Sequence, residues 1–137
     1  MNPPTADDTR EPACRGNTSG APPSTAAAAR ERVGALLRRA GISLDSVTAA
    51  DALLVTSELV TNAIRHGGGV TAFHADITDD ALHLSVADPS PRTPSVRTHS
   101  PAQPGGFGWP LIQHLTEHID ISRRPDGKTI TTTLRLA

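Results

Sequence analysis

Glu58 and Asn62 are polar residues within an apolar-periodic segment, and together they could carry chemistry. They stand four positions apart, so on a helix a carboxylate and an amide would project side by side from a rigid element. Their oxygen atoms could position a hard cation and a nucleophile. The alternative interpretation is a solvated polar face, which is the commoner fate of Glu and Asn on amphipathic helices.

Asp88 is a second candidate, because it follows the apolar segment 81–87 and is followed at once by Pro89-Ser90-Pro91. Its carboxylate would lie where a strand ends and a loop begins, a position that binding sites favour. There it could accept a hydrogen bond from an exocyclic amine such as that of adenine, and so discriminate against bases that lack this donor. The alternative is an ordinary Asp that caps a turn.

A glycine cluster is the third candidate. Gly105, Gly106, Phe107 and Gly108 stand between a proline-rich segment and a stretch with helical periodicity. Glycines let backbone amides wrap around an anion, and the amino terminus of a helix attracts phosphate through its unpaired amides and its dipole. The alternative is a flexible hinge for the preceding segment.

The helix that carries Glu58 and Asn62 is predicted over residues 49–65. We expect it to open at Thr48 with a capping-box-like start and to stop at the three glycines 67–69. On a helical wheel its apolar residues form a broad arc that would face a sheet, and the polar pair falls on another side.

An earlier helix is predicted over residues 25–40, where Ala, Arg, Glu and Leu predominate and Gly41 stands where a C-terminal cap belongs. Residues 1–24 are rich in Pro, Gly, Thr, Ala and charged residues without periodicity. Such a composition cannot bury enough apolar area to offset chain entropy. The sequence therefore predicts a disordered tail over 1–24 and one domain over 25–137.

Strands, a loop and a third helix are predicted beyond the three glycines. Alternating apolar residues around two turn sequences predict two hairpins, with strands over 70–78, 81–87, 119–122 and 129–136. Residues 89–104 are proline-rich and predict a long mobile loop, and residues 111–119 have helical spacing. This order of elements predicts an α+β fold, a two-layer sandwich with helices on one face of a mostly antiparallel mixed sheet.

Composition excludes several classes of protein. The chain has 137 residues, a formal net charge of -1, a single cysteine and 2% aromatic residues. The charge gives no reason to expect nucleic acid or a membrane as partner, and base stacking on aromatic platforms is unavailable. Neither a secretory signal nor a run of about twenty apolar residues is evident, so we expect a reducing, cytoplasmic setting.

Three segments in the same order resemble the sequence boxes of one ATPase superfamily. Glu58-Leu59-Val60-Thr61-Asn62-Ala63-Ile64-Arg65-His66-Gly67 closely resembles the N box of the gyrase, heat-shock chaperone, histidine kinase and mismatch-repair ATPases, in the form found in bacterial anti-sigma-factor serine kinases. Val86-Ala87-Asp88-Pro89-Ser90 resembles the first adenine-contacting box, and the segment from Gly105 to Ile112 resembles the second glycine box. The resemblance covers the chain from about residue 25 onward.

This resemblance implies a nucleotide site and a role for each candidate. Glu58 would be the catalytic base, Asn62 would hold Mg²⁺, and Asp88 would bind the adenine amino group. Residues 89–104 would form the ATP lid, with Arg92 or Arg97 meeting the outer phosphates. The residues implied to contact ATP are Asn62, Arg65, His66, Asp88, Arg92, Gly105, Gly106, Phe107, Gly108 and Thr129, the last as a strand threonine that supports Asp88.

The function implied is that of an ATP-binding anti-sigma regulatory factor, a magnesium-dependent serine/threonine protein kinase that phosphorylates an anti-sigma-factor antagonist. A sigma factor would be the competing partner, and a homodimer is compatible with the resemblance. Two departures, Pro89-Ser90-Pro91 after Asp88 and Trp109-Pro110 after the glycine box, leave open an alternative: a regulatory module that binds ATP but transfers no phosphate. The ATPase part of a two-component sensor is the weakest alternative, since no dimerising histidine helix is seen before the domain.

Two other motifs have less support. Gly127-Lys128-Thr129 lacks the earlier glycine and the following helix of a phosphate-binding loop. His114-Leu115-Thr116-Glu117-His118 spells an inverted zinc-protease motif on the predicted third helix. No downstream acidic ligand is evident, so we expect no zinc there.

Overall fold

The computed structural model describes residues 14–18, 21–92 and 108–136. Helix α2 (Ala26–Arg39) begins at the cap residue Thr25, whose hydroxyl accepts a hydrogen bond from the Ala28 amide at 3.0 Å. At its end, Gly41 has a φ of 83° and the Ile42 amide donates to the Leu37 carbonyl at 2.9 Å. This arrangement is a Schellman cap, and it confirms the predicted first helix and its glycine stop.

Helix α3 (Val47–His66) is the long helix that carries Glu58 and Asn62. It begins two residues before the predicted start, because the hydroxyl of Ser46 accepts a hydrogen bond from the Ala49 amide at 3.1 Å. Thr48 therefore lies inside the first turn and is not its cap. The helix ends at Gly67, as the three glycines predict.

By length and composition alone, α3 is long and apolar enough to cross a membrane, although no such segment was expected from the sequence. Its apolar residues are largely on one side, where they are buried in the core of the domain. A helix that lies in a protein core passes the same test of length and hydropathy. The buried residues of α3 are Ala49, Ala52, Val55, Thr56, Leu59, Val60 and Ala63.

Within the described residues, the sheet has five strands in the order β1-β2-β3-β5-β4, and all four neighbouring pairs are antiparallel. A turn at Asp79 and Asp80, both with positive φ, joins β2 to β3 and matches the predicted tight hairpin. The strands are β1 (Cys14–Thr18), β2 (Ala72–Thr78), β3 (Ala81–Asp88), β4 (His118–Arg124) and β5 (Gly127–Arg135).

Edge strand β1 lies inside the segment 1–24, which composition predicts to be disordered. It pairs with β2, with Thr18 opposite Ala75 and an irregularity between Cys14 and Gly16. Pairing at a sheet edge depends on backbone groups and needs no apolar alternation, so composition contains no signal for it. Residues 1–13, 19 and 20 of that segment lie outside the described residues.

Helix α4 (Gly108–Leu115) ends four residues before the predicted end of the third helix. The Glu117 amide donates to the Thr133 carbonyl at 2.8 Å, so the chain has already joined the sheet there. His114 is in α4 and His118 begins β4. The two imidazoles that the zinc-protease motif would place on one helix therefore belong to different elements.

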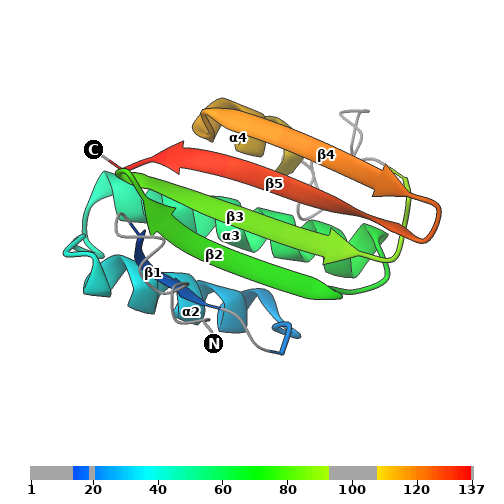
Figure 1. The fold of residues 1–137 in the computed structure, drawn as a ribbon, viewed down its shortest axis with the longest axis horizontal. Helices are drawn as coiled ribbons and strands as arrows, with labels where there is room; N and C mark the ends of the chain where they lie inside the picture. Colours follow the sequence, from blue (N-terminus) through cyan, green and yellow to red (C-terminus); the bar gives the residue numbers. More distant parts are fainter. Residues whose placement is uncertain (1–13, 19–20, 93–107, 137) are drawn as a thin grey trace, which may run out of the picture.

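Helices α2, α3 and α4 cover one face of the sheet, so the described part of the chain forms two layers (Figure 1). The core between them contains buried residues from α2, α3 and α4 and from the facing side of β2, β3 and β5. This architecture confirms the predicted α+β sandwich. The largest fully buried apolar side chains are Leu36, Leu37, Leu59, Ile77, Leu82, Leu84 and Ile112.

Candidate functional site

The carboxyl end of α3 meets the end of β3, and this contact brings two of the candidate segments together. A Cβ atom added to Gly67 would lie within 2.7 Å of all three atoms of the Asp88 carboxyl group. Just beyond the glycines, the Thr71 amide donates to the Ala87 carbonyl at 2.8 Å. The last residue of the N box and the proposed adenine-binding residue are thus in direct contact.

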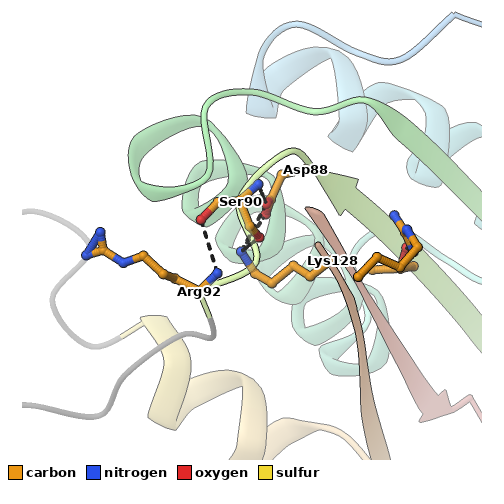
Figure 2. Close-up of polar contacts among 6 residues, drawn as sticks. Asp88, Ser90, Arg92 and Lys128 are labelled. Atoms are coloured by element: carbon orange, nitrogen blue, oxygen red, sulfur yellow. Dashed lines mark hydrogen bonds and ion pairs between the residues drawn. The ribbon is translucent and has the colours of Figure 1, made fainter. Parts of the chain in front are cut away.

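Asp88 is 2% exposed and forms a buried ion pair with Lys128, which is 3% exposed. The Lys128 ammonium donates to Asp88 Oδ2 at 2.9 Å and to Oδ1 at 3.0 Å, and also to the Ser90 carbonyl at 3.3 Å. The Ser90 amide donates to Asp88 Oδ1 at 2.9 Å. Figure 2 shows these groups converging where β3 leaves the sheet.

The resemblance implied that Thr129 supports Asp88, but in the structure Lys128 contacts the Asp88 carboxylate instead. In the β3–β5 register Asp88 lies opposite Lys128, and Thr129 lies opposite Ala87. Successive side chains of a strand point to opposite faces, so Thr129 faces away from Asp88, and its hydroxyl accepts a hydrogen bond from Arg124 at 3.4 Å. A shift of one residue in register decides this assignment, and the sequence does not fix the register to that accuracy.

Gly127 is a second residue that sequence reasoning missed. A Cβ atom at Gly127 would overlap the Asp88 carbonyl oxygen and lie 3.1 Å from the Pro89 Cα atom. Only a residue without a side chain allows β5 to start this close to the end of β3. Gly127 begins β5 directly after a turn, and a glycine in that position gives no sequence signal of such a contact.

Glu58 and Asn62 are both half-buried residues of α3. Burial raises the pKa of the Glu58 carboxyl above its ordinary value, and the nearby positive charge of Arg65 partly offsets this shift. At a rise of 1.5 Å per residue, Asn62 lies about 7.5 Å and Glu58 about 13.5 Å along the helix axis from Gly67. A ligand that reached Glu58, Asn62 and Asp88 would therefore be elongated.

Three basic residues of the predicted site, Arg65, His66 and Arg92, are exposed. Arg65 and His66 form the last turn of α3, close to Gly67. The Arg92 amide donates to the Ser90 hydroxyl at 3.2 Å, and in Figure 2 its side chain extends away from the Asp88–Lys128 pair.

Of the predicted glycine box, Gly105, Gly106 and Phe107 lie outside the described residues, as does Arg97. Gly108 is the first residue of α4, and Pro110 is in the first turn, where a missing amide hydrogen costs nothing. α4 packs into the core through the buried Ile112 and the half-buried Trp109, and it contacts α3. The amino terminus of a helix thus follows the glycine box, as predicted.

The side chains at the Glu58–Asn62 end of the site suit magnesium and a phosphoryl acceptor, whereas the carboxylate at the Asp88 end already has a partner. The Asn62 amide oxygen is a suitable ligand for Mg²⁺, and the Glu58 carboxyl is a suitable base for the hydroxyl that accepts the phosphoryl group. Mg²⁺ is usually held by few protein ligands together with the phosphates of the substrate. Among the described residues there is no group of three or more His, Cys, Asp or Glu side chains that could hold a metal alone. At the other end, the Asp88 carboxylate is already bound by Lys128.

Comparison with known proteins places these features in a family. Residues 20–134 match the histidine kinase-like ATPase domain. Among solved structures, the RsbU and RsbW domains of Rv1364c from Mycobacterium tuberculosis match 88% of this chain and 32% of that chain, at 22% identity and a TM-score of 0.64. The histidine kinase domain of the blue-light activated histidine kinase EL346 from Erythrobacter litoralis matches 86% of this chain and 68% of that chain, at 19% identity and a TM-score of 0.49.

The chain spans about a third of the length of the Mycobacterium tuberculosis structure, and at these identities the likeness concerns the fold. No curated protein sequence matches the chain significantly. The family match covers both layers of the sandwich, including α3, Asp88 and the strand that carries Lys128, and membership implies that the domain binds ATP. The chain belongs to the histidine kinase-like ATPase domain family.

Proposed function

We propose that this domain is an ATP-binding regulator of the anti-sigma-factor type, acting as a magnesium-dependent serine/threonine protein kinase on an anti-sigma-factor antagonist. One observation supports the kinase chemistry above the others. Glu58 is a half-buried carboxyl with a raised pKa, one helical turn from Asn62, on the helix that ends against Asp88. A shift in this direction moves a carboxyl towards the pH at which a general base works best.

Each residue then has a defined task in the proposed reaction. Bound ATP with magnesium would supply the phosphoryl group. Glu58 would orient or deprotonate the incoming serine or threonine hydroxyl, and the Asn62 amide oxygen would hold the magnesium ion near the phosphates. Arg65 and His66, exposed in the last turn of α3, would contribute hydrogen-bond donors at the end of the helix nearest Gly67.

The proposed partners follow from the three sequence boxes. An anti-sigma-factor antagonist would be the phosphoryl acceptor, and a sigma factor would compete with it for the domain according to nucleotide state. The fold shared with a structure that contains an RsbW domain is compatible with such a role. Both partners would meet the domain in the cytoplasm, as a monomer or a homodimer.

The kinase proposal is tested by incubating the full chain with γ-labelled ATP, Mg²⁺ and candidate anti-sigma-factor antagonists from the same organism. We expect label on the antagonist, lost with Glu58→Gln and retained with Glu31→Gln, which removes the same charge from an exposed position on α2. Nucleotide titration should give similar ATP affinity for wild type and Glu58→Gln. Nucleotide binding without any transfer of label would reject the kinase and leave an ATP-binding domain.

The second candidate, a regulatory module that binds ATP without phosphotransfer, has an observation of its own. Asp88 accepts three hydrogen bonds from Lys128 and Ser90. Its carboxylate is therefore less available to a nucleotide than a carboxylate without such partners would be. For this candidate, ATP would still raise the affinity for a sigma factor. Asn62→Ala would then abolish the magnesium-dependent part of ATP binding, and Thr61→Ala, its neighbour on α3, would not.

A further inference from the structure

We propose that Lys128 determines the base selectivity of the nucleotide site by occupying the carboxylate of Asp88. This inference rests on the proposed function, in which Asp88 is the acceptor for the base. With Lys128 in place, the site would distinguish poorly between purines with an amino group and purines with a carbonyl group at position 6. Lys128 would thus be a specificity-determining residue that acts through Asp88.

Counting donors and acceptors supports the proposal. An ammonium group has three N–H donors, and those of Lys128 are directed at Asp88 Oδ1, Asp88 Oδ2 and the Ser90 carbonyl. A carboxylate offers about four acceptor positions, and three of them receive Lys128 twice and the Ser90 amide once. Gly67 packs against the same carboxyl group, so little of it is left for an incoming amine.

The burial of both side chains strengthens the ion pair between Lys128 and Asp88. The side chains are 3% and 2% exposed, so water does not screen the charges as it does at a surface. To accept a hydrogen bond from an exocyclic amine in ordinary geometry, Asp88 would have to release an N–H of Lys128. A carbonyl oxygen at position 6 can accept from the ammonium in place of the Ser90 carbonyl, which has the longest of the three contacts at 3.3 Å, and the ion pair with Asp88 then stays intact. The pair therefore removes the advantage that a free carboxylate gives to adenine.

Lys128 is in strand β5, so its replacement should be a residue that suits a strand. Thr is well suited to a β-strand. Lys128→Thr removes the ammonium group and leaves a side chain too short to contact the Asp88 carboxylate. Arg123 on β4 lies directly opposite Lys128 in the β4–β5 register and is exposed. Arg123→Thr is therefore a matched control that removes one positive charge at the same level of the sheet.

The experiment is calorimetric titration of the full chain with ATP and GTP in the presence of Mg²⁺. In wild type and in Arg123→Thr we expect the affinity for ATP to be within about threefold of the affinity for GTP. Such a difference is smaller than the contribution of one hydrogen bond. For Lys128→Thr we expect ATP to bind at least about tenfold more tightly than to wild type, with GTP changed less.

A wild-type preference for ATP above tenfold, unchanged in Lys128→Thr, would overturn this inference and leave the proposed function standing. Failure of all three proteins to bind either nucleotide would reject the proposed function itself.

A second measurement covers the case in which Lys128→Thr does not fold. In ¹⁵N-labelled wild-type protein, the buried and fully hydrogen-bonded ammonium of Lys128 should give a slowly exchanging signal. Saturating ATP should leave that signal in place, because Lys128 keeps the Asp88 carboxylate occupied while the nucleotide is bound. Loss of the ammonium signal on addition of ATP, but not on addition of GTP, would show that adenine displaces Lys128 and would contradict the proposal.

Discussion

Gly67, the residue after α3, lies directly against the carboxyl group of Asp88, the last residue of β3. The contact joins the helix that carries Glu58 and Asn62 to the strand end that carries the proposed base acceptor. Neither element could approach the other this closely if residue 67 had a side chain. The glycine after the N-box helix therefore has a packing role besides ending the helix.

The first prediction concerns this contact. Gly67→Ala places a Cβ atom within 2.7 Å of the Asp88 carboxyl group, so the helix end or the carboxylate must move. We expect a loss of about 1–3 kcal/mol in the free energy of unfolding, which is typical of overpacking, together with weaker nucleotide binding. Urea denaturation and calorimetry measure the two effects.

Gly34→Ala is the matched control for Gly67→Ala. Gly34 is inside α2, and an added Cβ there would meet only the Leu44 Cδ1 atom at 3.9 Å, an ordinary contact. Replacing a glycine inside a helix by alanine should stabilise it by about 0.5–1 kcal/mol. Equal effects of the two substitutions would mean that the contact between Gly67 and Asp88 does not constrain the fold.

The second prediction concerns the buried ion pair. Lys128→Met leaves the Asp88 charge buried without its partner and should cost about 3–5 kcal/mol in the free energy of unfolding. The double variant Lys128→Met with Asp88→Leu removes both charges and should recover most of that loss. Chemical denaturation of the two single variants and the double variant gives the coupling energy.

The exposed ion pair between Arg135 and Glu117 provides the comparison. Its removal should change the free energy of unfolding by less than about 1 kcal/mol. Additive effects of Lys128→Met and Asp88→Leu would argue against a direct interaction between the two buried groups.

The third prediction is a pH dependence at Glu58. Burial raises the pKa of this carboxyl in the folded protein above its usual 4.5, so the folded state favours the protonated form. The stability that protonation contributes is complete below the unfolded pKa and is lost as pH rises through the higher folded pKa. Glu58→Gln should therefore be more stable than wild type near pH 7, by less than about 1 kcal/mol for a partly exposed group.

This stability difference should shrink as the pH falls through the raised folded pKa, and it should be absent below 4.5, the ordinary pKa of the group. Thermal melts over a pH series measure it. Glu31→Gln on α2 should leave the free energy of unfolding within about 0.5 kcal/mol of wild type, because Glu31 is exposed. A Glu58→Gln variant that is less stable than wild type at pH 7 would contradict the burial argument.

The fourth prediction tests whether Ser46 or Thr48 caps the amino terminus of α3. Ser46→Ala removes the hydroxyl that accepts from the Ala49 amide and should cost about 1 kcal/mol in the free energy of unfolding. Thr48→Ala, at the start expected from sequence, should cost less than about 0.5 kcal/mol. Thermal denaturation of both variants distinguishes them, and a larger loss at Thr48 would favour the later start.

Periodicity and end signals allowed the sequence to predict α2, α3 and the two hairpins, because these depend on neighbours within a few residues. The boundaries were less accurate. The third helix was predicted over 111–119, and α4 ends at Leu115, since the backbone of Glu117 pairs with Thr133 in β5. Strand β1 had no signal, because an edge strand can be held by backbone pairing alone.

The sequence by itself determined the composition of the site: a carboxylate and an amide one turn apart on a helix, an Asp at a strand end, and glycines at both helix boundaries. Those are local properties of residue type and spacing. Only the tertiary structure decided that Lys128, and not Thr129, faces Asp88, and that Gly67 and Gly127 pack against that same residue. Strand register and close packing are set by contacts between segments far apart in the chain, and a shift of one residue turns a side chain to the opposite face of the sheet.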